Sequence, residues 1–421
     1  ALDPETLFSF IMTTQPKTWS HLRTQYGDQE VKGRVLARID REIGRRGVLD
    51  VLRNGVKDVG ARIHLAYFKP AHGLNEETAR LYRANVFQVM RQVRFNPETA
   101  QSVDLVVLLN GVPLFTAELK SPMNGQSVED AIWQYKKDRS NKHTLFHHGR
   151  CLAHFAVDPE YAYMTTKLEG KKTNFLPFNR GNQGGAGNPP VRTDYATAYL
   201  WRDVWRPDSV LELVEKFCAD VYEEDPNDGS RKRKVIFPRY HQREAVQAMI
   251  TDIVGRGAGK NYLVQHSAGS GKSNTIAWLA HQLSMLFDQQ DARVFDSIIV
   301  ITDRRVLDRQ LRETIKQFEN VDGVVAPVEK NAQELRDALE KGRTIITTTL
   351  QKFPMIVDEV GKLPGKRFAV IVDEAHSSQG GDSAKQMKSV LGTGNLDDAE
   401  RQEEALDDPD DRINAYMEQR G

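Results

Sequence analysis

Residues 265–273 read QHSAGSGKS, a glycine-rich run that lies between an apolar segment and an amphipathic one. The hydrophobic pattern predicts a strand over residues 261–265 and a helix over residues 273–287. A strand that breaks into a glycine turn and then a helix directs backbone N–H groups and the helix N-terminus to one point, and this arrangement holds phosphate oxygens. The stretch therefore indicates an α/β fold that binds a nucleoside triphosphate.

The residues of this loop have separate expected roles in holding ATP. We expect the Lys272 ammonium to reach the β/γ-phosphates and the Ser273 hydroxyl to ligate Mg²⁺. His266 stands where the pattern G-x-x-x-x-G-K-[ST] has its first glycine, but the residues whose backbone must approach phosphate are kept. A plain tight turn is the alternative interpretation. The expected cofactor-binding residues are Gly269, Ser270, Gly271, Lys272 and Ser273.

A second motif, DEAH at residues 373–376, follows the apolar run 368–372. A carboxylate pair that ends a parallel strand lies at the mouth of the sheet. There Asp373 is expected to hold the metal and Glu374 to orient the water that attacks the γ-phosphate. Because the two motifs occur in this order and at this spacing, together they favour ATP binding and hydrolysis over an accidental glycine turn.

Composition restricts the class of protein. The chain has 421 residues, of which 39% are hydrophobic and 28% charged, which is typical of a soluble globular protein with two or three domains. No run approaches the roughly 18 apolar residues of a membrane span, and no secretory signal is visible. Cys151 and Cys218 have no metal-ligand spacing, so we expect free thiols in a cytoplasmic protein. The net charge of zero argues against indiscriminate nucleic-acid binding but allows a local basic groove.

The pattern along the chain predicts several parts. The strands expected at 297–302, 344–349 and 368–372 alternate with helices, which indicates a parallel sheet covered on both faces. The basic block 231–234 is interpreted as part of a solvated linker, with phosphate contact as the alternative. The expected parts are a helical segment 1–60, an α+β domain 61–222, a linker 223–234, an α/β lobe 235–395 and an acidic segment 396–421.

Within the α+β domain, residues 103–109 and 112–119 form the clearest predicted hairpin, because Asn110-Gly111 is a strong two-residue turn signal. A helix is predicted over residues 128–139. The remaining expected elements are a helix over 76–92 and a strand pair at 152–157 and 161–166.

The hairpin brings three chemically useful side chains together. Asp104 lies on its first strand, and Glu118 and Lys120 lie at the end of the second, facing the same side. Two carboxylates form an oxygen-rich site suited to Mg²⁺, and the lysine can orient a water for attack on a phosphodiester. A surface cluster of cross-strand ion pairs is the alternative.

The predicted helix 128–139 follows these residues in the chain. Gln134, Tyr135 and Lys136 are candidates to line a groove for the DNA backbone. Tyr135 and Trp133 are equally compatible with a place in the core.

Several of these motifs resemble known families. The D-x13-E-x-K arrangement of Asp104, Glu118 and Lys120 is similar to the PD-(D/E)xK nuclease core, with Val103 in place of the proline. Residues 240–243 resemble the motif that reads adenine through a glutamine, here Gln242. The two ATP motifs, with 302–305 and 348–353, resemble superfamily 2 helicase-like motors, in which Arg304 is a DNA-contact candidate. A nuclease placed before such a motor is similar to HsdR, the restriction subunit of type I restriction enzymes.

The resemblance to this subunit carries further implications. It implies a PD-(D/E)xK-type α+β nuclease domain followed by a RecA-like lobe, with translocation of double-stranded DNA driven by ATP and Mg²⁺-dependent cleavage. It also implies partner subunits for methylation and for sequence specificity. Gln134 and Tyr135 are adjacent here, whereas some nucleases of this superfamily carry Q-x-x-x-Y. No second lobe with an arginine finger follows, so we expect an N-terminal piece of a longer subunit with little ATPase of its own.

Two rival functions remain open at this point. The first is a stand-alone superfamily 2 helicase with an accessory DNA-binding domain, for which metal-dependent cleavage that requires Asp104 is the discriminating observation. The second is a nucleotide-gated scaffold that binds partner subunits and performs no chemistry. The recognition sequence, the cleavage position and the subunit stoichiometry do not follow from these residues.

Overall fold

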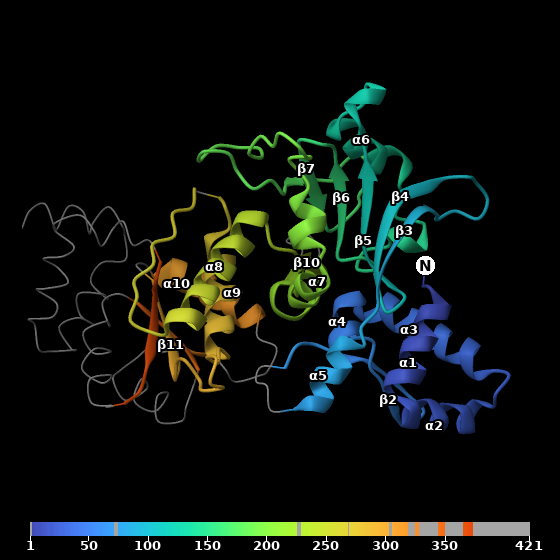
Figure 1. Cartoon of the computed structure of the whole chain (residues 1–421), viewed down its shortest axis with the longest axis horizontal. Coiled ribbons are helices and arrows are strands. Elements are labelled where there is room, and N and C mark those ends of the chain that lie inside the picture. Colours follow the sequence, from blue (N-terminus) through green and yellow to red (C-terminus); the bar gives the residue numbers. More distant parts are fainter. Residues whose placement is uncertain are drawn as a thin grey trace, which may run out of the picture. The chain divides into compact units, whose positions relative to one another are not determined.

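The computed structural model has a mixed α/β architecture that divides into two compact units, Ala1–Glu244 and Ala245–Gly421 (Figure 1). We call them the N-terminal unit and the C-terminal unit and describe each by itself. The structure describes residues 2–70, 75–224, 229–267, 269–302, 305–318, 325–327, 344–349 and 365–373.

The N-terminal unit begins with a group of helices, as expected for residues 1–60. The first helix starts at Pro4, which suits an N-terminal position because it lacks an N–H, and the Asp3 side chain accepts a hydrogen bond from the backbone N–H of Glu5. In the third helix Val35, Ile39 and Ile43 recur at a spacing of four and are buried on one face. The helices are α1 Pro4–Thr14, α2 Pro16–Tyr26, α3 Val31–Arg46 and α4 Val48–Asn54.

A small hairpin connects these helices to the main sheet. Strands β1 Val56–Asp58 and β2 Ala61–Ile63 pair antiparallel. Helix α5 Glu76–Arg83 follows, and the Asn75 side chain caps it by accepting from the Thr78 N–H.

Six strands form the sheet of the N-terminal unit, in the order β3-β4-β5-β6-β7-β8. All neighbours pair antiparallel except β5 and β6, which run parallel. The predicted hairpin is confirmed, with Asn110 and Gly111 at φ of 52° and 80°, as a tight turn requires. The strands are β3 Phe87–Arg94, β4 Ser102–Leu109, β5 Val112–Leu119, β6 Ala153–Val157, β7 Ala162–Thr165 and β8 Leu176–Pro177.

The helix predicted over residues 76–92 is wrong in its second half. Helix α5 ends at Arg83, and strand β3 begins at Phe87 and pairs with β4 along its length. The edge of the apolar strand β4 offers residues 87–94 a ladder of hydrogen bonds. Pairing with β4 therefore outweighs continuation of a helix that buries none of its residues.

Helix α6 Val128–Asp138 makes the crossover between the parallel strands β5 and β6 and confirms the predicted helix. It packs against β5, β6 and β7, and Figure 1 shows it beside these strands. Its first turn is fixed where the Ser127 N–H donates to the Asp130 carboxylate at 2.8 Å, one half of a capping box. Its buried face consists of Val128, Ala131, Ile132 and Tyr135.

The last part of the N-terminal unit is a second antiparallel hairpin, β9 Ala219–Glu224 with β10 Arg231–Ile236. Residues 223–224 and 231–234 of the expected linker lie in these two paired strands, and the basic block forms most of β10. Arg233 donates to the His148 carbonyl oxygen at 3.0 Å, and its guanidinium packs against Gly47 and Gly149. Upstream lie helix α7 Pro207–Glu212 and the π-helical turns Leu200–Val204 and Leu213–Phe217.

Both cysteines are free thiols and lie in the interior of the N-terminal unit. Burial raises the pKa of Cys151 and of Cys218 to about 12, so both are protonated at neutral pH. Their role in the structure is that of small apolar side chains.

The C-terminal unit contains the expected parallel sheet, with the strand order β12-β13-β11-β14. The central strand β11 Ser297–Thr302 is completely buried, as is typical of a strand covered on both faces. The other elements are β12 Val325–Pro327, β13 Ile345–Thr349, β14 Phe368–Val372, α9 Lys272–Ser284 and α10 Arg305–Gln317. Helix α8 Tyr240–Arg256 begins in the N-terminal unit and ends in the C-terminal one.

The strand predicted over residues 261–265 does not form. This segment has no regular structure, and Leu263 is 74% exposed. The Tyr262 hydroxyl donates to the Asp252 carboxylate of α8 at 2.8 Å, so the segment is attached to its own preceding helix rather than to a sheet edge. Among the described residues, no helix is long and apolar enough to cross a membrane.

Candidate functional site

The structure brings Asp104 and Glu118 together at one end of the β4–β5 hairpin. Leu105 pairs with Ala117, and continuing this register places Asp104 of β4 beside Glu118 of β5. The Asp104 carboxylate is fixed by two donors, the Leu119 N–H at 2.8 Å and the Gln92 side-chain amide at 3.0 Å. It is partly exposed, so it faces solvent at the edge of the sheet.

Glu118 lies deeper than its neighbour and is completely buried. One carboxylate oxygen accepts a hydrogen bond from Arg139 Nε at 2.6 Å, and the Arg139 side chain is only 4% exposed. The other oxygen, Oε2, is buried without a hydrogen-bond partner in the part of the chain that the structure describes. A buried, unpartnered carboxylate oxygen is costly unless a proton, a donor or a cation reaches it.

The electrostatics of this pair follow from burial. Burial raises the pKa of the Glu118 carboxyl to about 7; the guanidinium of Arg139 lowers it, and the carboxylate of Asp104 raises it further. Two close carboxylates and a free buried oxygen fit a divalent cation, which favours carboxylate ligands. In the described ranges no group of three or more His, Cys, Asp or Glu side chains gathers for a metal. Water or substrate oxygens would therefore have to complete the coordination.

Lys120 follows directly after the last residue of β5. Its backbone N–H donates to the Val157 carbonyl oxygen at 2.9 Å, which extends the pairing of β5 with β6 by one residue. Its side chain is partly buried, whereas Leu119 between it and Glu118 is 41% exposed. The alternation expected along the strand thus holds for Glu118 and Leu119, and the catalytic role of Lys120 stays a prediction.

The candidates on α6 differ in exposure. Tyr135 is completely buried, as in the core alternative, and its hydroxyl lies 2.7 Å from the Thr116 hydroxyl. A side chain in this position does not reach DNA. Gln134 and Lys136 are partly buried, and the Gln134 side-chain oxygen has no hydrogen-bond partner among the described residues.

Sequence reasoning missed Arg139 and His154. Arg139 stands one residue beyond α6 and four after Tyr135, so the face that buries Tyr135 also brings Arg139 to the sheet. That spacing was the available signal. His154 is on β6, its Nδ1 lies 2.8 Å from the Thr116 hydroxyl, and burial lowers its pKa to about 3. A lone histidine in an apolar strand gives no such signal.

In the C-terminal unit, the glycine loop leads directly into α9. Gly269 and Gly271 adopt positive φ angles of 71° and 83°, which a residue with a side chain disfavours. Gly271 caps the helix, so Lys272 and Ser273 form its first turn, at the positive end of the helix dipole. Ser270 is buried. The glycine turn and the helix after it thus retain part of the predicted arrangement, without the strand expected before them.

The second ATP motif begins where β14 ends. Asp373 follows Val372, and its N–H donates to the Ile301 carbonyl oxygen at 2.9 Å. Because β11 and β14 run parallel, Asp373 lies at the carboxyl edge of the sheet, and α9 packs against β11, β13 and β14. Glu374, His376, Arg304 and the motif 350–353 lie outside the described residues.

Gln242, expected to read adenine, lies in the first turn of α8. Its side-chain oxygen accepts a hydrogen bond from the Arg239 N–H at 2.8 Å, and the residue is only 3% exposed. In this conformation the amide oxygen caps its own helix. Phe237 and Tyr240 next to it pack on Phe155 and Phe178 of the N-terminal unit, with ring centres about 6.1 Å apart.

Comparison with known proteins gives two family matches. Residues 13–173 match the N terminus of Type I restriction enzyme R proteins, and residues 241–395 match the SWI2/SNF2 ATPase family. The first range contains the carboxylate pair and the second contains both ATP motifs.

Curated relatives agree with these matches. The chain is 26% identical over 313 residues to a type I restriction enzyme endonuclease subunit of Staphylococcus aureus, covering 72% of this chain and 30% of the relative. It is 25% identical to the HindI endonuclease subunit of Haemophilus influenzae, covering 69% and 27%. A putative type I subunit of Methanocaldococcus jannaschii is 24% identical, covering 82% and 33%. The resemblance to the N-terminal region of type I restriction subunits is confirmed, and the chain spans about a third of the length of these relatives.

Proposed function

We propose that this chain forms the nuclease and first motor lobe of a type I restriction subunit, which cleaves double-stranded DNA and couples ATP hydrolysis to its translocation. One observation carries the proposal. The range that matches the restriction family contains a completely buried glutamate, one oxygen of which has no hydrogen-bond partner among the described residues, directly beside a second carboxylate. A surface cluster of ion pairs would not bury one carboxylate and leave its oxygen free.

In the nuclease site, Asp104 and Glu118 are the residues that would hold Mg²⁺. When bound, the ion would neutralise the negative charge that develops on the scissile phosphate. Lys120 is assigned to orient the attacking water. Arg139 is a positioning residue, because its bond to one Glu118 oxygen leaves the second oxygen, Oε2, directed elsewhere. This set amounts to a PD-(D/E)xK-type site.

In the motor lobe, the loop residues from Gly269 to Ser273 are assigned to the triphosphate of ATP. Lys272 would compensate the charge of the β/γ-phosphates, and Ser273 and Asp373 would hold Mg²⁺. Glu374 would orient the attacking water. The partners proposed for the whole protein are duplex DNA and the methyltransferase and specificity subunits of the same complex.

The test separates the two chemistries in the full-length subunit assembled with its partners. Asp104→Ala, Glu118→Ala or Lys120→Ala should lower cleavage of a circular duplex by about a hundredfold or more, because several kcal/mol of transition-state stabilisation is lost. DNA-dependent ATP turnover should remain. Either carboxylate change should also weaken Mg²⁺ binding, measured by calorimetry, whereas Lys120→Ala should not. Normal cleavage in all three variants would return these residues to a surface charge cluster and favour the stand-alone helicase.

A further inference from the structure

Helix α3 carries a row of arginines that neither proposed active site uses. Arg34, Arg38, Arg41 and Arg45 follow one another at intervals of four, three and four residues, so they lie on one face of the helix. At 1.5 Å per residue the row is about 16 Å long. Arg34, Arg41 and Arg45 are exposed and Arg38 is partly so. The exposed flank of α3, beside its buried face, is thus a basic stripe.

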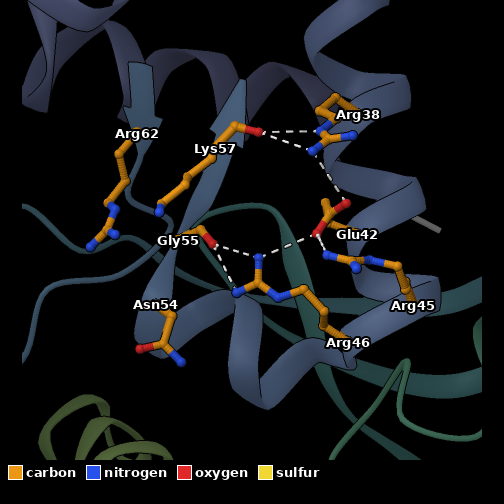
Figure 2. Close-up of a pocket in the computed structure, with 8 residues that line it drawn as sticks. All are labelled: Arg38, Glu42, Arg45, Arg46, Asn54, Gly55, Lys57 and Arg62. Carbon is orange, nitrogen blue, oxygen red and sulfur yellow. Dashed lines mark hydrogen bonds and ion pairs between the residues drawn. The ribbon is translucent and has the colours of Figure 1, made fainter. Parts of the chain in front are cut away.

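A pocket of about 350 Å³ opens beside this stripe (Figure 2). Figure 2 shows basic side chains reaching it from two elements: Arg38, Arg45 and Arg46 come from α3, and Lys57 and Arg62 come from the β1–β2 hairpin. An adjoining hollow of about 550 Å³ shares Arg38, Lys57 and Arg62 and adds Asp58. The residues that line the first pocket are Arg38, Glu42, Arg45, Arg46, Asn54, Gly55, Lys57 and Arg62.

One buried carboxylate organises this pocket. Glu42 is 3% exposed and lies 3.4 Å from Arg38, 2.9 Å from Arg45 and 3.3 Å from Arg46 (Figure 2). The hydrogen bond from Arg45 holds the pKa of Glu42 below its usual range despite burial, and the hydrogen bond from Arg46 and the charge of Arg38 act in the same direction. A single negative charge therefore fixes three guanidinium groups around one opening.

Other acids compensate only part of this charge. Asp50 accepts a hydrogen bond from Arg46 at 2.6 Å, Asp58 lies 4.0 Å from Arg38, and the exposed Glu30 lies 3.0 Å from Arg34. The Arg45 side chain stays 68% exposed despite its contact with Glu42, and Lys57 and Arg62 are exposed on the hairpin. Since the whole chain has no net charge, the positive charge here is a local concentration.

We propose that this surface, which we call the α3 basic surface (Arg34, Arg38, Arg41, Arg45, Lys57 and Arg62), binds the phosphodiester backbone of duplex DNA. The inference rests on the proposed function, which supplies a duplex substrate. One strand of B-DNA carries a phosphate about every 3.4 Å along its axis, so a row of about 16 Å faces several phosphates. Guanidinium groups bind phosphate oxygens in pairs of hydrogen bonds. A free nucleotide would occupy the pocket but not the row.

The position of α3 indicates an anchoring role for this surface rather than a catalytic one. Arg150, which precedes β6, donates to the Asp40 carbonyl oxygen of α3 at 3.0 Å. Since β5 runs parallel to β6, α3 lies near the beginning of these strands and Glu118 near the end of β5. A strand of eight residues spans about 26 Å, so a duplex that contacts both would extend along the sheet.

The experiment compares duplex binding by three triple variants of the full chain. Arg45→Ala with Lys57→Ala and Arg62→Ala removes three exposed charges and leaves Glu42 its contacts with Arg38 and Arg46. The control combines Arg80→Ala, Lys167→Ala and Arg202→Ala, which removes three other exposed charges of the N-terminal unit. Fluorescence anisotropy with a labelled duplex at increasing sodium chloride gives the slope of log affinity against log salt, and circular dichroism checks folding.

In the first triple variant, the magnitude of that negative slope should fall by about one for each lost phosphate contact, up to about three. Binding at low salt should weaken by at least about tenfold. The control should match the unchanged chain. A third variant that keeps the charges, Arg45→Lys with Lys57→Arg and Arg62→Lys, should retain most of the slope. An unchanged slope in the first variant would overturn the inference, as would an equal loss in the control.

Two further arms identify the source of any effect. Calorimetric titration with inorganic phosphate tests for a small anion site. If the unchanged chain binds phosphate tightly, and the first variant loses this binding but still binds the duplex normally, the ligand of this surface is a small phosphate compound and not DNA. Cleavage by the assembled Glu118→Ala subunit tests the proposed function separately. Loss of cleavage there together with an unchanged slope in the triple variant would remove this inference alone, whereas retained cleavage would remove the proposed function.

Discussion

The two sheets of this protein bring their candidate chemistry together in different ways. In the N-terminal unit, Asp104 and Glu118 lie on adjacent antiparallel strands joined by a two-residue turn, so local geometry alone makes them neighbours. In the C-terminal unit, Lys272 and Asp373 are far apart in the chain, and a parallel sheet with its helices brings their segments to one lobe. A hairpin site depends on one turn, whereas a parallel-sheet site depends on the whole lobe.

The largest expected effect on activity concerns the ATP-binding loop of the C-terminal unit. Lys272→Ala in the full assembly should lower ATP turnover and translocation by about a hundredfold or more. The variant lacks the positive charge that stabilises the negative charge developing on the phosphates. The fold should not change, since Lys272 lies in the first turn of α9. A coupled ATPase assay with circular dichroism measures both. Tight, Mg²⁺-dependent ATP binding with normal turnover would contradict the assignment of the loop.

Arg139 provides a sharper test of the hairpin site, because it stabilises the fold and positions Glu118. Arg139→Ala should cost about 3–5 kcal/mol in the free energy of unfolding, since it leaves a completely buried carboxylate without its ionic partner. Urea denaturation measures the loss. Arg45→Ala is the matched control: its exposed ion pair should cost less than about 1 kcal/mol. Equal costs in the two variants would show that the Glu118–Arg139 pair is not buried in solution.

Burial of His154 in the sheet of the N-terminal unit predicts that the stability of this unit depends on pH. The unfolded chain takes up a proton near the ordinary pKa of 6.5, whereas burial keeps the folded histidine neutral down to a pKa of about 3. Its contribution to stability is therefore complete above about pH 6.5 and is lost as the pH falls towards 3, at up to about 1.4 kcal/mol per pH unit. His154→Gln should reduce that slope between pH 6.5 and 5, measured by urea denaturation. An identical slope in the variant would show that His154 is accessible to protons.

The smallest expected effect concerns the crossover helix that carries Arg139 to the sheet. Asp130→Ala removes the acceptor for the Ser127 N–H at the start of α6 and should cost about 1 kcal/mol. Asp130→Asn, which keeps an acceptor oxygen, should cost less. Thermal unfolding of both variants measures the difference, and an equal loss for Asn and Ala would assign the contribution of Asp130 to its charge rather than to the acceptor oxygen of the cap.

Local signals predicted the parts of the fold that depend on few residues. The Asn110-Gly111 turn placed both strands of the hairpin, and the strand alternation placed Glu118 and Leu119 on opposite faces. The parallel sheet followed from the alternation of apolar strands with helices. In each case one short pattern and one rule of geometry were sufficient.

The failures occur where a distant partner decides. Residues 87–92 continue a helical pattern, but the edge of β4 pairs with them as β3. Residues 261–265 are apolar enough for a strand, but Tyr262 bonds to Asp252 and the run stays outside the sheet. Arg139 became visible as part of the site only once α6 was packed on β5. The roles of Asp104, Glu118 and Lys120 stay predictions, because geometry alone does not show turnover.

The contact of Arg233 with Gly47 and Gly149 has a consequence for how such chains can diverge. A Cβ atom at either glycine would collide with the Arg233 guanidinium, and both glycines also adopt positive φ angles. Two independent constraints therefore act on each position. Among relatives, we expect positions 149 and 233 to covary, because the collision disappears where the arginine is replaced by a shorter residue. Position 47 should stay glycine in either case, because its φ of 88° and ψ of 158° lie in a region that other residues hardly adopt. Alignment columns could thus record the docking of the β9–β10 hairpin.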